Sequence, residues 1–258
     1  MSRTPASDMS SSKEVPQSLQ VTSSVEGLQL APQPGAWIRG RLRLESKSST
    51  GSNRPLDPGQ TFLALRPVDG EDQIPGGFAA GDVFSQISQI AADGSFEWKN
   101  VPPGRYSVQL AGDGGGDWFV KSVPAGGRDD EAGISVNGGV VTLDLVASPN
   151  GAIADGVVTD AKGEPVANAV IVAVPEARLR ARLDRYRKTV SDQTGRFTLH
   201  GMPAGDYTLF AWESVDDEAY YNPEFLKGYE GQGSALRVAE GDRKGVQIQA
   251  IPDGEPHE

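Results

Sequence analysis

Short runs in which apolar and polar residues alternate follow one another along most of the chain, separated by turns rich in Gly and Pro. Alternation with a period of two is typical of strands that bury one face. Val166–Val174 differs because it is almost continuously apolar and β-branched, as a fully buried strand is. We predict strands at Ala36–Glu45, Thr61–Arg66, Val83–Ala91, Ser95–Trp98, Tyr106–Leu110, Gly133–Val136, Val140–Ala147, Ala152–Thr159, Val166–Val174, Arg196–Leu199, Tyr207–Trp212, Ser234–Ala239 and Val246–Ile251.

Three segments depart from this pattern. Glu176–Lys188 has no Gly, Pro or β-branched residue, and its apolar residues Leu179, Leu183 and Tyr186 recur with helical spacing. We therefore predict a short amphipathic helix there. A helical turn is expected to begin near Pro223, and Lys47–Pro58 is predicted to be a polar loop.

An internal repeat links two parts of the chain at a constant offset of 101 residues. Identical large, small and turn-forming residues at one spacing indicate a duplicated unit. The two copies each contain a tyrosine, Tyr106 or Tyr207, that follows Pro-x-Gly-x at the start of a strand. This position predicts that the tyrosine hydroxyl forms a hydrogen bond to nearby backbone. His200 is expected to replace Asn100 of the first copy. The repeated pairs are Gly94 and Gly195, Phe96 and Phe197, Pro102 and Pro203, Gly104 and Gly205, and Tyr106 and Tyr207.

A second repeated element indicates where the units meet. An alternating strand followed by a Pro turn occurs before Pro34, before Pro149 and before Pro252. The copy at 25–31 has no unit before it, so it is either an added edge strand or the end of a longer array. The predicted domains are a tail with this strand at 1–34, a first domain at 35–148, a second at 149–252 and a tail at 253–258.

Strands at hairpin spacing without helical crossovers define an all-β fold. Each unit holds about seven of them. The expected architecture is two tandem seven-stranded Greek-key β-sandwiches, with a short inserted helix in the second.

The segment Asp192–Tyr207, DQTGRFTLHGMPAGDY, together with the preceding hairpin Gly156–Val174, resembles the carboxypeptidase regulatory-like domain. This is a transthyretin-like β-sandwich, grouped with carbohydrate-binding-like folds. Asp93–Tyr106 matches the same pattern in part. The resemblance implies a non-catalytic accessory module, and it implies an extracellular, periplasmic or outer-surface location in bacteria.

Charge and composition exclude several classes of function. The net charge of −11 opposes a nucleic-acid or anionic-membrane binder, which needs a positive surface. Cysteine is absent, and the two histidines, His200 and His257, are far apart in sequence, so a zinc peptidase site is not expected. There is no GxSxG motif, no signal peptide and no transmembrane segment. We expect no enzyme activity, cofactor or metal.

Two charged features have alternative interpretations. The acidic clusters at 129–131 and 216–218 are either calcium ligands or solvated loop residues. The segment 176–188 carries a local charge of +4, with five Arg and one Lys against Glu176 and Asp184. It is either a solvated or domain-docking helix, or a contact surface for an acidic partner.

Aromatic residues supply the candidate ligand surface. Rings with polar groups at their rim bind sugars by stacking, although the same rings also cover the end of a β-sandwich core. The leading hypothesis is a structural or interaction module with another envelope protein or an adjoining domain as partner. The alternative is a carbohydrate-binding accessory module with a polysaccharide as partner. The candidate residues are Trp212, Tyr220, Tyr221, Phe225 and Tyr229.

Overall fold

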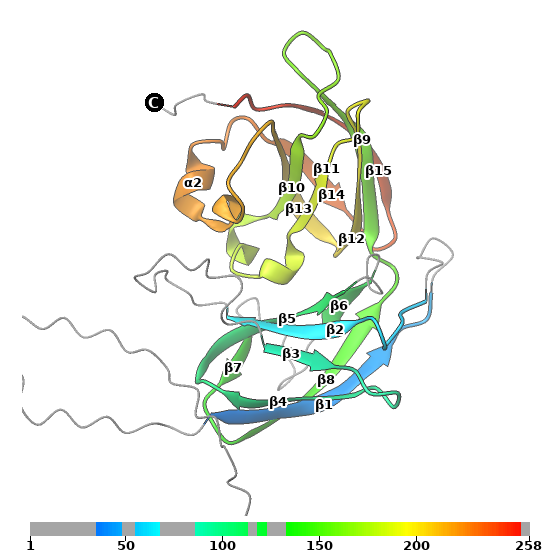
Figure 1. The fold of residues 1–258 in the computed structure, drawn as a ribbon, viewed down its shortest axis with the longest axis vertical. Helices are drawn as coiled ribbons and strands as arrows, with labels where there is room; N and C mark the ends of the chain where they lie inside the picture. Colours follow the sequence, from blue (N-terminus) through cyan, green and yellow to red (C-terminus); the bar gives the residue numbers. More distant parts are fainter. Residues whose placement is uncertain (1–34, 48–54, 68–85, 113–117, 123–132, 254–258) are drawn as a thin grey trace, which may run out of the picture.

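The computed structural model describes residues 35–47, 55–67, 86–112, 118–122 and 133–253. They form two β-sandwiches, drawn in Figure 1 with the first, blue to green, below the second, green to red. The predicted strand at 25–31, the acidic cluster at 129–131 and His257 lie outside the described residues. No helix of the described part is long and apolar enough to cross a bilayer.

The first sandwich contains eight strands in the described residues, one more than predicted. The additional strand is β6, which pairs with β8 in a part of the chain where the sequence predicts no strand. With four residues, it is too short to show an alternating pattern. One sheet has the order β4 (Ser95–Val101), β1 (Ala36–Leu44), β8 (Val140–Ser148) and β6 (Phe119–Ser122). The other has the order β3 (Gln86–Gln89), β2 (Phe62–Pro67), β5 (Gly104–Ala111) and β7 (Ile134–Val136).

The second sandwich contains seven strands in the described part of the chain, in sheets of three and four. Its closing strand β15 pairs in parallel with its opening strand β9, as β8 pairs with β1 in the first sandwich. The smaller sheet has the order β12 (Arg196–Met202), β9 (Ala152–Thr159) and β15 (Arg243–Gln249). The larger has the order β11 (Arg187–Val190), β10 (Val170–Pro175), β13 (Gly205–Trp212) and β14 (Ser234–Val238).

The prediction of a helix over Glu176–Lys188 is wrong. The segment forms two single 3₁₀ turns, at Ala177–Leu179 and Leu183–Arg185, and then enters β11. Arg182 interrupts helical geometry between the turns with φ −87° and ψ 84°. A helix this short is marginal by itself, and the hydrogen bonds that β11 makes to the edge of β10 are available only to an extended chain.

The helical turn expected near Pro223 is confirmed as α2, Pro223–Lys227. Asn222 caps it by accepting a hydrogen bond from the backbone N–H of Glu224 at 2.8 Å, and Pro223 occupies its first turn. A 3₁₀ turn at Ala219–Tyr221 precedes it. Together these turns cover one face of the second sandwich (Figure 1).

Strand β10 is buried on both faces, which explains its nearly continuous apolar sequence. Ile171 and Ala173 point into the core between the two sheets of the second sandwich. Val172 and Val174 point to the opposite face, into a separate aromatic cluster below α2. The first sandwich has its own core, formed by residues between Ala36 and Ala147.

The repeated glycines and tyrosines have the same backbone conformation and the same hydrogen bonds in both sandwiches. Gly94 and Gly195 have φ values of 81° and 73°, and a Cβ on either would lie 2.6 Å from the carbonyl oxygen of the neighbouring opening strand. Tyr106 Oη donates to the Pro102 carbonyl at 2.9 Å, and Tyr207 Oη donates to the Pro203 carbonyl at 2.8 Å. The predicted hydroxyl-to-backbone bonds are confirmed.

The expected equivalence of His200 and Asn100 is wrong by one position. Asn100 and Gly201 are the residues that share a left-handed conformation, with φ values of 57° and 65°. They stand 101 residues apart, the offset of the repeat. The register between opening strand and neighbour shifts at this place in both sandwiches. His200 is an exposed residue of β12 beside this bulge.

A glycine in the middle of each opening strand allows the two neighbouring strands to approach it closely. A Cβ on Gly156 would overlap the Val246 carbonyl oxygen of β15 and lie 3.1 Å from the Phe197 ring. Gly40 has the same relation to the Leu143 carbonyl oxygen and the Phe96 ring. The ring of the repeated phenylalanine thus covers a position where no side chain fits.

Gly156→Ala is expected to destabilise the protein by about 1–3 kcal/mol, the usual cost of forcing a methyl group into a packed site. Gly245→Ala in the paired strand β15 is the matched control, because no atom lies within 4 Å of a Cβ there. Its effect should stay within about 0.5 kcal/mol. Equal midpoints of urea denaturation for the two variants would contradict the proposed close approach.

Candidate functional site

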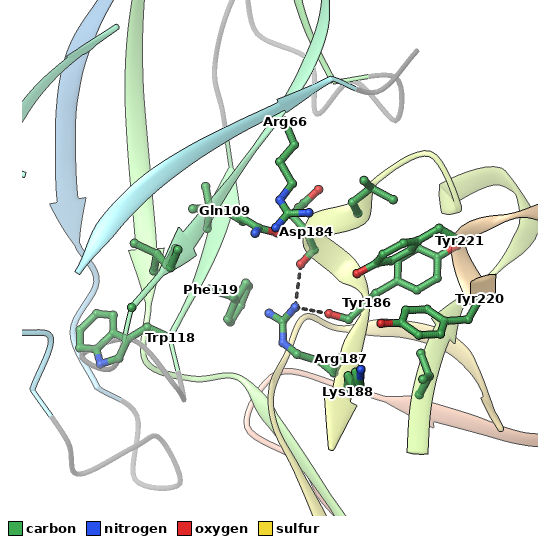
Figure 2. Close-up of a pocket in the computed structure, with 16 residues that line it drawn as sticks. Arg66, Gln109, Trp118, Phe119, Asp184, Tyr186, Arg187, Lys188, Tyr220 and Tyr221 are labelled. Atoms are coloured by element: carbon green, nitrogen blue, oxygen red, sulfur yellow. Dashed lines mark hydrogen bonds between the residues drawn. The ribbon is translucent and has the colours of Figure 1, made fainter. Parts of the chain in front are cut away.

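A cavity of about 320 Å³ lies where the two sandwiches meet. In Figure 2 the first sandwich contributes Trp118 and Phe119 on one side, and the second contributes a group of tyrosines on the other. Arg66 of β2 extends toward Asp184 across the space between them (Figure 2). The wall from the first sandwich includes Arg66, Gln109, Leu110, Trp118, Phe119 and Val120. The wall from the second includes Val172, Leu183, Asp184, Tyr186, Arg187, Lys188, Tyr220 and Tyr221.

The predicted ligand surface is divided by the structure. Tyr220 and Tyr221 line the cavity, whereas Trp212, Phe225 and Tyr229 pack together behind it. Trp212 is 1% exposed, with its ring stacked on Phe210 at a centroid distance of 5.2 Å. The five rings lie close together, and most of their area packs within the aromatic cluster beneath α2, so that the described residues form no open platform of rings.

Two acidic residues near the cavity are already paired with cations. Asp184 accepts from Nε and Nη2 of Arg182, both at 2.7 Å, and the pair is largely buried. Asp217 accepts from Nζ of Lys188 at 2.6 Å. Lys188 lowers the pKa of Asp217 through this hydrogen bond and its charge, and Asp217 raises the pKa of Lys188. The first pair is local to the turn that precedes β11, and the second joins β11 to the segment before the turn at Ala219–Tyr221.

Two tyrosines of the cavity, Tyr186 and Tyr221, have pKa values raised above the ordinary value and remain protonated at neutral pH. Burial, reinforced by the adjacent Tyr220, raises the pKa of Tyr221 to about 12. Burial also raises the pKa of Tyr186, whose ring packs edge-on against Tyr221 at 4.9 Å between centroids. The Tyr186 hydroxyl is buried and has no hydrogen-bond partner among the described residues. These hydroxyls can donate hydrogen bonds but cannot act as bases near neutral pH.

An ion-pair network joins the sandwiches beside the cavity. Nζ of Lys121 lies 2.9 Å from carboxylate oxygens of Glu45 in its own sandwich and of Glu240 in the second. Ser148 also donates to Glu240 at 3.2 Å. Hydrogen bonds to both carboxylates raise the pKa of Lys121, so the cation is favoured at this junction.

The described residues supply few groups for catalysis. No cluster of three or more His, Asp or Glu residues that could hold a metal occurs among them. Of the acidic residues at 216–218, Asp217 is used in the pair with Lys188. His200 is exposed on β12 and is not among the residues that line the cavity. What the cavity offers is hydrogen-bond donors, aromatic edges and positive charge.

Most polar residues of the cavity were missed by sequence reasoning. Arg66 and Gln109 lie on predicted strands of the first sandwich, and nothing in their local sequence marks them as site residues. The sequence pattern places Tyr186 on the apolar face of a helix, which the structure does not contain. The one available signal was the local positive charge of 176–188, because two of its cations, Arg187 and Lys188, line the cavity.

Comparison with known proteins agrees with this picture of the second sandwich. Residues 155–250 match the model of the family described as "Carboxypeptidase regulatory-like domain". The match covers most of the second sandwich and does not extend to the first. Among curated proteins no match is found.

Several solved structures resemble the chain weakly. The minor pilin of Streptococcus agalactiae has 14% identity and a TM-score of 0.30, with 86% of this chain and 99% of the pilin covered. The TIE protein of Bacillus anthracis has 16% identity and a TM-score of 0.25. The match covers 85% of this chain but only 34% of the length of the TIE protein. A 5-hydroxyisourate hydrolase of Klebsiella pneumoniae has 16% identity and a TM-score of 0.24, with 40% of this chain and 92% of the hydrolase covered. At these values the similarity says nothing about what this chain binds.

Tyr220→Ala is expected to destabilise the second sandwich by about 3–5 kcal/mol, the range for removing a large ring from a core. Tyr220 is 4% exposed and packs against Tyr221 with centroids 4.7 Å apart. Ile87→Ala on β3 is the control, because Ile87 is 64% exposed, and it should change stability by less than about 0.5 kcal/mol. A melting temperature unchanged by Tyr220→Ala would favour the ring-platform hypothesis instead.

Proposed function

We propose that the chain is a non-catalytic structural or interaction module of a bacterial cell-envelope or secreted protein. Its role in this proposal is to hold two β-sandwiches in one orientation and to present their surfaces to a partner. The partner is an envelope protein or an adjoining domain.

The observation that carries this proposal is the junction between the sandwiches. Pro149, Asn150 and Gly151, the residues between β8 and β9, are all buried. The Asn150 side-chain amide donates to the Ser46 carbonyl at 3.2 Å, and the Asn150 backbone carbonyl accepts from the backbone N–H of Gly241 at 2.7 Å. A buried, hydrogen-bonded connection restricts relative motion, unlike the polar linkers that join independent domains. Restricted motion suits a structural module, because the surfaces of the two sandwiches then keep a fixed orientation toward a partner.

We further propose that the first sandwich is a second copy of the regulatory-like unit, with domains at 35–148 and 149–252. Parallel pairing of the opening and closing strands occurs in both sandwiches, and so does the tyrosine bond to a proline carbonyl. Each sandwich also has its own core cluster. These correspondences support duplication more directly than five identical residues do.

A fragment of residues 149–252 is expected to fold alone and unfold in one cooperative transition. It retains all of its strands and both of its core clusters, and Trp212 is its only tryptophan, so fluorescence reports on it alone. The fragment should be less stable than in the full chain, because it loses the bonds to Ser46 and Lys121. A fragment with exposed Trp212 and no transition would show that the sandwiches share one folding unit.

The alternative function is that of a carbohydrate-binding accessory module. It is favoured by the composition of the cavity, where half-buried Tyr221 stands near Gln109 and two arginines. Ring edges beside amide and guanidinium donors suit a hydroxylated ligand.

A glycan array and a pull-down with insoluble neutral polysaccharides separate the two functions. For the structural module we expect no neutral glycan to bind the full chain above the signal of the Tyr221→Ala variant. A glycan retained by the unaltered chain, lost with Tyr221→Ala and kept by Ile87→Ala would establish the alternative.

A further inference from the structure

Two arginines, one from each sandwich, line the cavity without a carboxylate of their own. We propose that the cavity binds a small organic anion, of about the size of a monosaccharide, whose carboxylate or phosphate bridges Arg66 and Arg187. The proposal is independent of the proposed function, because a structural module can hold such a ligand equally well.

Within the part of the chain that the structure describes, the guanidinium of Arg187 is bonded only to neutral backbone carbonyl groups. Its Nε and Nη2 donate to the Gly201 carbonyl at 3.0 and 2.6 Å. Its Nη1 donates to the carbonyls of Asp184 and Tyr186 at 2.7 and 2.8 Å (Figure 2). Arg187 is half-buried as a residue, yet protein atoms surround its guanidinium closely enough that burial lowers its pKa. The carbonyls orient the group, but they leave its charge without a counter-ion.

No carboxylate of the described residues forms an ion pair with this guanidinium. The Asp184 carboxylate favours the charged form of Arg187, but both of its oxygens are bonded by Arg182. Asp217 is bonded to Lys188. Desolvated charges are costly unless they are paired, so an unpaired guanidinium beside a cavity favours an anion inside it.

Arg66 adds a second free cation from the opposite wall. Its Nε is buried without a hydrogen-bond partner, and no ion pair to Arg66 occurs among the described residues. Arg66 also lies close enough to Tyr221 for its charge to oppose the rise in the pKa of that hydroxyl. Four of the five N–H groups of Arg187 bond carbonyls, which leaves one Nη2 N–H, and this group and the Arg66 guanidinium can together donate to the oxygens of a carboxylate or phosphate.

The remaining lining limits the ligand to a small molecule with polar groups. A cavity of about 320 Å³ is at the lower end of small-molecule sites and is too small for a folded partner. The Tyr186 hydroxyl, on a residue 6% exposed, has no hydrogen-bond partner in the described ranges. Tyr221 and Trp118 offer ring surfaces. A hydroxylated ring bearing one acidic group satisfies all of these features.

The experiment is calorimetric titration of the full chain with glucuronate, with inorganic phosphate and with glucose, at constant ionic strength. We expect glucuronate or phosphate to bind and to raise the melting temperature, because a ligand that binds only the folded state stabilises it. Glucose, which lacks the charge, should do neither. Glucuronate alone would identify a sugar carboxylate as the ligand group, and phosphate alone would identify a phosphoryl group.

Arg66→Met is the test variant because it removes the charge and leaves Arg187 in place. It should weaken anion binding by at least about tenfold. Arg41→Met is the matched control, since Arg41 lies on the outer face of the first sandwich and its side chain is 66% exposed. Arg66→Gln serves as the second variant if Arg66→Met does not fold.

Three results would overturn the proposal. The first is that neither anion binds the unaltered chain at millimolar concentration. The second is that Arg66→Met and Arg41→Met weaken binding equally, which would indicate general charge attraction. The third is that glucose binds as well as glucuronate, which would point to the carbohydrate-binding alternative without an anion site.

Discussion

The parallel pairing of the first and last strands in each sandwich is the constraint on which the rest of the structure depends. Strand β8 lies between β1 and β6, so the chain leaves the first sandwich from the interior of a sheet. Only Pro149, Asn150 and Gly151 then separate β8 from β9, which opens the second sandwich. With so short a connection, the second sandwich begins at the end of the first. The contact between Lys121 and Glu240, and the cavity beside it, follow from this placement.

The same pairing explains why the most visible sequence motif concerns the fold alone. A parallel strand on one side and an aromatic ring above leave no room for a side chain at Gly40 or Gly156. The repeated phenylalanines supply those rings, and the repeated tyrosines tie the following strands to a proline carbonyl. The repetition of these residues therefore indicates that the two sandwiches are packed in the same way. The residues that line the cavity stand outside the repeat.

Local patterns predicted the strands because alternation and turn chemistry are properties of neighbouring residues. They also predicted α2, where Asn222 and Pro223 act within one turn. The helix over 176–188 failed because the hydrogen bonds of β11 to β10 come from distant sequence. The cavity could not be predicted for the same reason. Arg66 and Arg187 are brought together only by the contact between sandwiches, and charge alone does not say which arginine lacks a partner.

Because the cavity lies between the two sandwiches, the binding of a ligand there is coupled to their relative orientation. Walls from both sandwiches enclose it, so any occupant that contacts Arg66 and Arg187 must favour the closed arrangement over one in which the sandwiches separate. The Lys121 network favours that arrangement too, but its side chains are about one-third exposed, so salt weakens it. An anion held inside the cavity is screened less. Among the described residues, Arg66 and Arg187 line this cavity and form no ion pair with a carboxylate, so an anion that contacts both would add to the attraction between the sandwiches.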